Sequence, residues 1–166
     1  GWVNGFYTKP RVDKDLLEKH HEGLIALSGC LAGEVSRALQ RNDYDEAKRV
    51  AEWYRDVFGK DNYYLEIQNH GITEQLQINP DLIKLSKELG IPLVATNDAH
   101  YVDKQDAKMQ QVLICIQTNH TLGEDTGLEF GTQEFYLKSE DEMLEAFSQC
   151  PQAVYNSAEI AERCNV

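Results

Sequence analysis

The stretch GIPLVATNDAHY, residues 90–101, contains the pattern that decides the fold. Its Gly-Ile-Pro start ends one element, and the apolar run Leu93–Thr96 that follows shows no polar alternation. Such a run is typical of a strand that is buried on both faces of a parallel sheet flanked by helices. Because residues two apart on a strand share a face, we expect the Asp98 and His100 side chains to point the same way at its carboxyl end.

Aspartate and histidine are common ligands of zinc and manganese, and they also form acid/base pairs. The carboxyl ends of strands are the place where α/β folds put their functional sites. The alternative is structural, with Asp98 as a helix cap and His100 as an ordinary loop residue. The spacing alone favours the structural alternative, and the neighbouring residues shift the balance toward a site.

Two further strands are expected at residues 23–28 and 63–68, and helices separate them from each other and from Leu93–Thr96. Periodic apolar positions predict helices over Asp13–His21, Val35–Arg41 and Tyr44–Phe58. A further helix is expected to start at Pro80 with Asn79 as its cap, and residues 1–13 are expected to form a loop. This alternation predicts an α/β fold with parallel strands, whose carboxyl ends all lie at one edge of the sheet.

The character of the chain changes after His100. A helix capped by Asp103 is expected to run to about Thr118, followed by a polar loop over residues 119–133 and a short strand over 135–137. Ser139 and Glu142 have capping-box spacing, and Pro151 is expected to start a last helix that ends near residue 164. We therefore expect an α/β unit with about three βα repeats over residues 1–118, and a loop with a helical extension over 119–166.

Composition limits the classes of function. The 166 residues suffice for one domain, and the net charge of −12 argues against an extended surface for nucleic-acid phosphates. No apolar run reaches membrane-spanning length, and no signal peptide is recognisable. The four cysteines form no CxxC pair, and without a secretion signal they are most simply reduced thiols in a cytoplasmic protein. The chain starts at Gly1 without a methionine, and we expect it to be an internal piece of a longer protein.

Cys30, His70, Asp98 and His100 follow the three expected strands and are candidates for one site. Thiolate, imidazole and carboxylate together would suit zinc best, and manganese less well because of the sulfur. Each residue also has a structural explanation, since a cysteine such as Cys30 is more often a small buried side chain than a ligand and His70 precedes a turn glycine. A cysteine hydrolase with Cys30 as nucleophile and His100 as base is a minor alternative.

Several blocks of the sequence are similar to a known family. The blocks are GLIALSGCLAGEVSRAL, YYLEIQNHG, GIPLVATNDAHY, VLICIQT, FYLKSEDEM and SAEIAERCNV. In this order they resemble the PHP (polymerase and histidinol phosphatase) domain at the amino terminus of bacterial DNA polymerase III alpha subunits. The resemblance covers essentially the whole chain, and it corresponds to the carboxyl-terminal half of that domain.

The resemblance implies part of a distorted seven-stranded βα barrel with a helical appendix. PHP domains hold up to three metals at the strand ends and hydrolyse phosphoesters with metal-activated water. Cys30 matches the family's ligand cysteine, and Asp98 with His100 match its final Asp-x-His pair. Glu66, His70 and Asn97 are expected near the site without a role as ligands. The early His-x-His motif of the family is missing, so this chain would supply only half of the metal site.

The family also implies a wider context. The parent chain would synthesise DNA with magnesium in a separate domain and would contact DNA through its other domains, with no membrane involved. The region described by this sequence would be a phosphoesterase site for zinc or manganese. The alternative is a catalytically silent scaffold that docks the proofreading exonuclease subunit. In either case the remainder of the alpha subunit is an expected partner.

Overall fold

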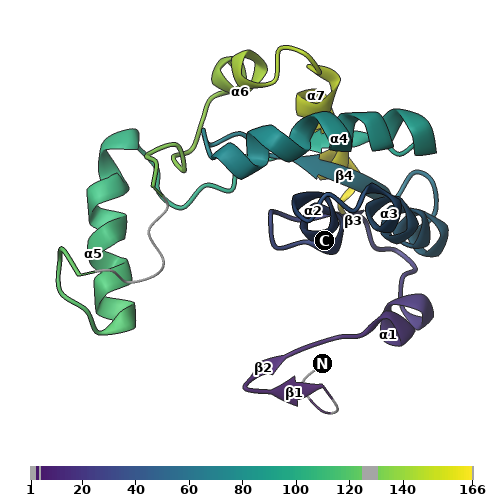
Figure 1. Ribbon diagram of the computed structural model, residues 1–166, viewed down its shortest axis with the longest axis horizontal. Coiled ribbons are helices and arrows are strands. Elements are labelled where there is room, and N and C mark those ends of the chain that lie inside the picture. Colours follow the sequence, from purple (N-terminus) through teal and green to yellow (C-terminus); the bar gives the residue numbers. More distant parts are fainter. Residues whose placement is uncertain (1–2, 4, 125–130, 166) are drawn as a thin grey trace.

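The structure, a computed structural model, describes residues 3, 5–124 and 131–165. At its centre lies a parallel sheet formed by β3 (Ala26–Leu27), β4 (Tyr63–Ile67) and β5 (Leu93–Ala95), in the order β3-β4-β5 (Figure 1). Each strand lies within the stretch from which it was predicted. The α/β class with parallel strands is thereby confirmed, whereas the complete seven-stranded barrel stays a prediction.

Helices connect and cover these strands. α1 precedes β3, α2 and α3 link β3 to β4, α4 links β4 to β5, and the later helices follow β5. The helical elements are α1 (Lys14–Lys19), α2 (Glu34–Gln40), α3 (Tyr44–Phe58), α4 (Thr73–Leu89), the 3-10 turn η1 (Lys104–Asp106), α5 (Ala107–Thr118), α6 (Glu140–Ala146) and α7 (Gln152–Arg163).

The two faces of β4 carry different kinds of side chain. Tyr63, Leu65 and Ile67 alternate along the strand and belong to the main hydrophobic core, which also contains buried residues of α2, α3 and α4. Glu66 and Gln68 lie on the opposite face because strand side chains alternate. β4 therefore has one face in the main core, and its opposite face carries the polar residues Glu66 and Gln68 near the carboxyl end of the strand.

The start of α4 differs from the prediction. The helix begins at Thr73 and contains Pro80 in its interior, although Asn79 and Pro80 were expected to cap and start it. Asn79 is not a cap because its side chain is buried and donates through Nδ2 to the Gln68 carbonyl at 2.9 Å. The contact with the end of β4 holds the first turns of α4 in place, although a proline inside a helix removes one backbone hydrogen bond.

Two short segments also differ from expectation. Residues 1–13 are not a plain loop, because β1 (Phe6–Tyr7) and β2 (Lys9–Pro10) pair as a small antiparallel hairpin. Residues 135–137 do not form a strand; the backbone makes only an isolated parallel bridge between Tyr101 and Tyr136.

The helix expected from Asp103 is divided into η1 and α5. Part of the polar loop expected at 119–133, residues 125–130, lies outside the described residues.

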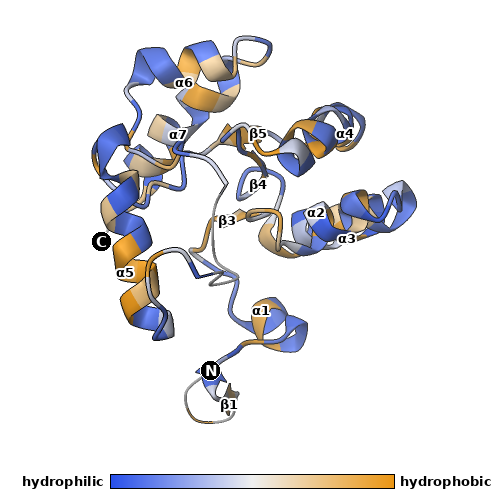
Figure 2. Cartoon of the chain, turned by 60° about the vertical axis from the view of Figure 1, so that its left-hand side comes forward, coloured by the Kyte–Doolittle hydropathy of each residue, from blue (hydrophilic) through white to orange (hydrophobic). Residues whose placement is uncertain are grey.

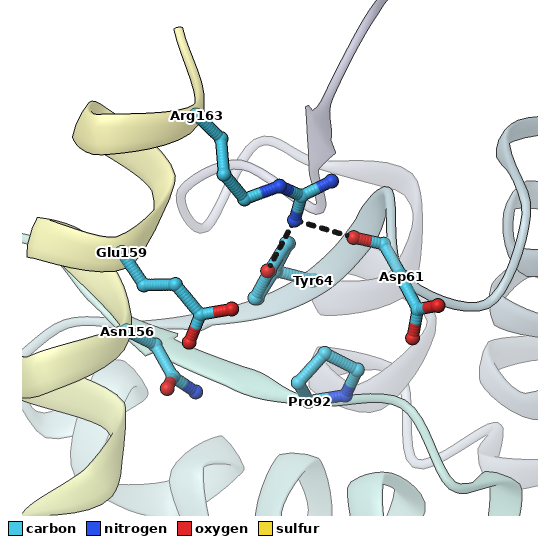
Figure 3. A pocket seen from close by; sticks show the side chains of 6 residues that line it. All are labelled: Asp61, Tyr64, Pro92, Asn156, Glu159 and Arg163. Carbon is cyan, nitrogen blue, oxygen red and sulfur yellow. Dashed lines mark hydrogen bonds between the residues drawn. The ribbon is translucent and has the colours of Figure 1, made fainter.

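α7 covers the outer edge of β5 and reaches the amino end of β4 (Figure 3). Asn156 of α7 donates through Nδ2 to the Leu93 carbonyl at 2.7 Å. Farther along the helix, the Arg163 guanidinium donates to the Asp61 carbonyl at 2.7 Å and to the Tyr64 hydroxyl at 2.9 Å. The Arg163 side chain, which lines the pocket in Figure 3, thus binds Asp61 and Tyr64 of the same pocket and links the end of α7 to the start of β4.

α5 stands apart from the sheet (Figures 1 and 2). Its Met109, Leu113 and Ile116 side chains are exposed by 62%, 58% and 71%, and no α5 residue belongs to the main core. These positions follow the i, i+4, i+7 spacing of one helix face. Among the described residues, no helix combines the length and the apolar character needed to span a bilayer.

The Tyr63 hydroxyl gives a test of the core. Its oxygen is buried, and no hydrogen-bond partner is found for it in the described part of the chain. We expect Tyr63→Phe to leave the free energy of unfolding unchanged or to raise it by about 1 kcal/mol, because no hydrogen bond is lost. Urea unfolding followed by circular dichroism measures this.

Tyr64→Phe is the matched control. It removes the oxygen that accepts from Arg163 and should lower the free energy of unfolding by about 1 kcal/mol. A loss of stability in Tyr63→Phe as large as that in Tyr64→Phe would contradict the assignment of an unpaired hydroxyl.

Candidate functional site

The candidate residues lie beyond the carboxyl ends of three adjacent strands. Cys30 follows β3, His70 follows β4, and Asp98 with His100 follows β5. Because the strands are parallel neighbours, the three segments leave the sheet at the same edge. The arrangement of the strands thus brings together segments that are 68 residues apart in sequence, from Cys30 to Asp98.

The Glu66 carboxylate connects all three strands. Its Oε2 accepts from the Gly29 backbone N–H at 3.1 Å, and its Oε1 accepts from Gln68 Nε2 at 3.2 Å and from the Thr96 hydroxyl. The Glu66 N–H donates in turn to Ser28 Oγ at 2.8 Å. A single side chain of β4 therefore fixes the end of β3 on one side and the end of β5 on the other.

Two glycines shape the turn that contains Cys30. Gly29 has a φ of +79°, which favours glycine and directs its N–H toward Glu66. A Cβ atom on Gly33 would overlap the Ser28 carbonyl oxygen. Cys30 itself is exposed as a residue and lines a cavity of about 10 Å³ beside Glu66. That cavity has room for about one water molecule.

His70 is a structural histidine at the end of β4. It is 1% exposed, and its Nε2 lies 2.7 Å from the Asn97 carbonyl, which can only accept a hydrogen bond. Its Nδ1 lies 3.0 Å from Gln75 Nε2, and Gln75 Oε1 accepts from the His70 backbone N–H. Both ring nitrogens of His70 therefore have hydrogen-bond partners within the fold. His70 holds the Asn97 backbone in place and has no ring nitrogen left to bind a metal.

Asp98 and His100 come together through a turn and not through an extended strand. β5 ends at Ala95, and Asp98 has a φ of +47°, so the expected alternation does not reach these residues. The His100 ring approaches Asp98 twice, with Nδ1 at 2.7 Å from the Asp98 carbonyl and at 4.0 Å from Oδ1. The carbonyl contact requires a proton on Nδ1, which leaves the lone pair of a neutral ring on Nε2.

The donors fit part of a metal shell. Metal-binding histidines commonly donate their other ring nitrogen to a carbonyl, as His100 does through Nδ1. Asp98 offers a carboxylate beside it, and both side chains are partly exposed. Zinc requires three or four ligands, however, and the described residues contain no group of three His, Cys, Asp or Glu placed to hold a metal. Cys30, Asp98 and His100 therefore do not form a three-ligand group in the described residues.

Fixed charges flank the turn on the side of residues 134–138. Glu134 pairs with Lys104 and Lys138, and the hydrogen bond from Lys104 lowers the Glu134 pKa. Burial lowers the pKa of Lys138, whose ammonium lies 4.1 Å from the centre of the Tyr136 ring. A hydrogen bond to Glu142 raises the Tyr136 pKa to about 12.

Sequence reasoning missed several residues of this site. The polar partners Thr96, Gln68 and Gln75 received no role, although the alternation in YYLEIQ already separates Glu66 and Gln68 from the apolar face. Phe135 also received no role at the site, because no local signal in the sequence connects residue 135 with residue 100.

Comparison with known proteins shows what the sequence is similar to. Residues 1–70 match the family model described as PHP domain. Curated DNA polymerase III alpha subunits match nearly the whole chain, with 45% identity over 164 residues in Borreliella burgdorferi and 47% over 165 residues in Treponema pallidum. The chain is a homologue of the PHP region of bacterial DNA polymerase III alpha subunits. The resemblance predicted from the sequence blocks is thereby confirmed.

The comparisons differ in what they cover. The PHP model includes Cys30, Glu66 and His70, whereas Asp98 and His100 fall only within the match to the alpha subunits. The match to the alpha subunit of Deinococcus radiodurans covers 100% of this chain, with 47% identity over 169 residues. This chain spans 13–14% of the length of these curated relatives.

The Glu66 carboxylate can be tested by Glu66→Gln in the PHP region. The amide would direct an NH₂ group toward Gly29 N–H or Thr96 O–H, so one of the three donors would lose its acceptor. We expect the free energy of unfolding to fall by about 1–3 kcal/mol. Chemical denaturation measures the change, and exposed Glu145→Gln on α6 is the control with the same change of charge. Equal, small effects of the two substitutions would exclude Glu66 as the link between the strands.

Proposed function

We propose that this chain is part of a bacterial replicative DNA polymerase alpha subunit and contributes ligands to a metal-dependent phosphoesterase site in its PHP region. The observation behind the proposal is the Asp98–His100 pair at the carboxyl edge of the sheet, in a chain whose relatives are polymerase alpha subunits. DNA synthesis would belong to the parent chain, with magnesium and the DNA contacts in its other domains.

In this proposal Asp98 and His100 bind an ion together, and Cys30, which forms no three-residue group with them among the described residues, is a further ligand that this chain supplies. The Nδ1 contact of His100 with the Asp98 carbonyl supports metal binding through Nε2. Cys30 lies on the adjacent turn beside Glu66, at the end of β3. The remaining ligands would come from the part of the PHP barrel that precedes this chain in the parent.

A bound zinc or manganese ion would lower the pKa of a water molecule for attack on a phosphoester. The chain's own residues would have three tasks. Asp98 and His100 would bind the ion, and the Glu66 network would keep the strand ends at fixed separations. His70 would hold the Asn97 carbonyl and with it the start of the turn.

Metal content of the parent alpha subunit tests this function. We expect Asp98→Ala combined with His100→Ala to remove at least one zinc or manganese ion per chain and to abolish hydrolysis of a model phosphodiester, because two of the ligands are lost. Elemental analysis and a chromogenic phosphodiester measure the two effects. His120→Ala is the control, since His120 is an exposed histidine of the loop after α5. Unchanged metal content in the double variant would refute the proposed site.

A second candidate function is docking of the proofreading exonuclease subunit. It is favoured by the exposed Met109, Leu113 and Ile116 on α5, whose i, i+4, i+7 spacing suits a helix that binds in a groove. α5 also contains no acidic residue, although the chain as a whole has a net charge of −12. The remainder of the alpha subunit is the competing partner for the same face.

Charged substitutions on α5 distinguish these partners. If the exonuclease binds this face, Leu113→Glu with Ile116→Glu should weaken its binding to the alpha subunit at least about tenfold, because two apolar anchors are lost. Titration calorimetry measures the affinity. Gln105→Glu with Gln117→Glu adds the same charge at other exposed positions and serves as the control. Unchanged affinity with a lower melting temperature of the alpha subunit would assign the face to the parent chain.

A further inference from the structure

Residues 134–138 run across the turn that contains Asp98 and His100. The Phe135 carbonyl accepts from the His100 N–H at 2.8 Å, and the Tyr136 carbonyl accepts from Asn97 Nδ2 at 2.7 Å. The Leu137 N–H donates to the Tyr101 carbonyl at 3.1 Å. A segment that follows His100 by about 35 residues in sequence thus hydrogen-bonds both ends of the turn.

The Phe135 ring lies between the two imidazoles of the site. It is stacked on His70 with centroids 4.0 Å apart and planes inclined by 8°, and it meets the His100 ring edge-on at 5.2 Å and 87°. Both arrangements are favourable for aromatic pairs. Because His70 is fixed on both nitrogens, Phe135 connects a rigid ring at the end of β4 with the ring of the proposed ligand.

The burial of Phe135 is not explained by the main core. The residue is 4% exposed, yet it is absent from the main hydrophobic cluster that contains Phe147 and the apolar residues of β4. Phe135 instead contacts the His70 and His100 rings at the site. This separates it from an ordinary core phenylalanine.

The turn itself needs external support. Asp98 adopts a φ of +47°, in the left-handed region that most residues with a Cβ avoid and that aspartate enters more readily. A residue in this region is held there by the structure around it. The hydrogen bonds and the ring contact from residues 135–137 contribute to holding this turn.

Residues 134–138 are held in place by contacts with α6 and η1. The Tyr136 hydroxyl donates to Glu142 of α6 at 2.6 Å, and Glu134 pairs with Lys104 of η1. Lys138 has only 6% of its side chain exposed and contacts both Glu134 and the Tyr136 ring. Residues 134–138 therefore form a well-anchored segment that packs against the turn of Asp98 and His100.

We propose that Phe135 is a positioning residue that holds the His100 ring and the strained Asp98 turn in the geometry needed for the site. The proposal rests on the proposed function for the role of the pair as metal ligands. It adds that the segment after residue 118, which was expected to be a separate extension, sets the geometry of a site on the α/β unit.

The experiment uses the full-length alpha subunit with Phe135→Leu, which keeps an apolar side chain but removes the ring. Phe147→Leu is the matched control, because Phe147 is equally buried in the main core. Should Phe135→Leu fail to fold, Phe135→Met fills more of the volume and replaces it. Phe135→Tyr retains the ring and is the conservative variant for rescue.

The first readout needs no metal. Hydrogen exchange of the peptide that contains residues 97–102 should accelerate in Phe135→Leu, because without the ring contacts the backbone of residue 135, whose carbonyl accepts from the His100 N–H, is held less firmly. Exchange should remain as in the unmodified protein in Phe147→Leu and in Phe135→Tyr. Equal acceleration in Phe135→Leu and Phe147→Leu would overturn the positioning role.

The second readout is the affinity for zinc, measured by competition with a chelator. We expect Phe135→Leu to weaken binding about tenfold or more, as for the loss of a residue that orients a ligand, and Phe135→Tyr to restore it. An unchanged affinity in Phe135→Leu overturns the proposal. If the unmodified alpha subunit binds no zinc and no manganese, the metal function fails, and the exchange result alone decides on Phe135.

Discussion

The Glu66 carboxylate is the constraint on which the site depends. β3 has two residues and β5 has three, so the backbone ladder contributes few hydrogen bonds to hold their ends. Three donors, from Gly29, Gln68 and Thr96, converge on one side chain of the central strand. Strands this short would otherwise be free to shift relative to one another, and the turns that follow them would move as well.

Local patterns in the sequence predicted the elements but not all of their boundaries. Continuous apolar runs located the three parallel strands, and the periodic face of α3 with its terminal Gly59 located that helix from end to end. The rule for proline failed at α4, because Asn79 and Gln75 use their side chains to bind the end of β4 instead of capping a helix. That choice depends on tertiary contacts that no local pattern records.

The site was predictable in its location but not in its geometry. Parallel strands predict that Cys30, His70 and Asp98 leave the sheet at one edge, and they do. The tautomer of His70 and the left-handed backbone of Asp98 follow instead from partners elsewhere in the chain. Phe135 illustrates the limit, since the His70 and His100 rings that it contacts lie 65 and 35 residues before it.

The two outer strands of the sheet differ in how they are covered, and this restricts where a further strand can be added. Asn156 of α7 takes up the Leu93 carbonyl on the outer side of β5, whereas β3 is the other outer strand and has no strand beyond it among the described residues. A further strand of the same sheet could therefore pair at β3, whereas at β5 the α7 helix stands in its way.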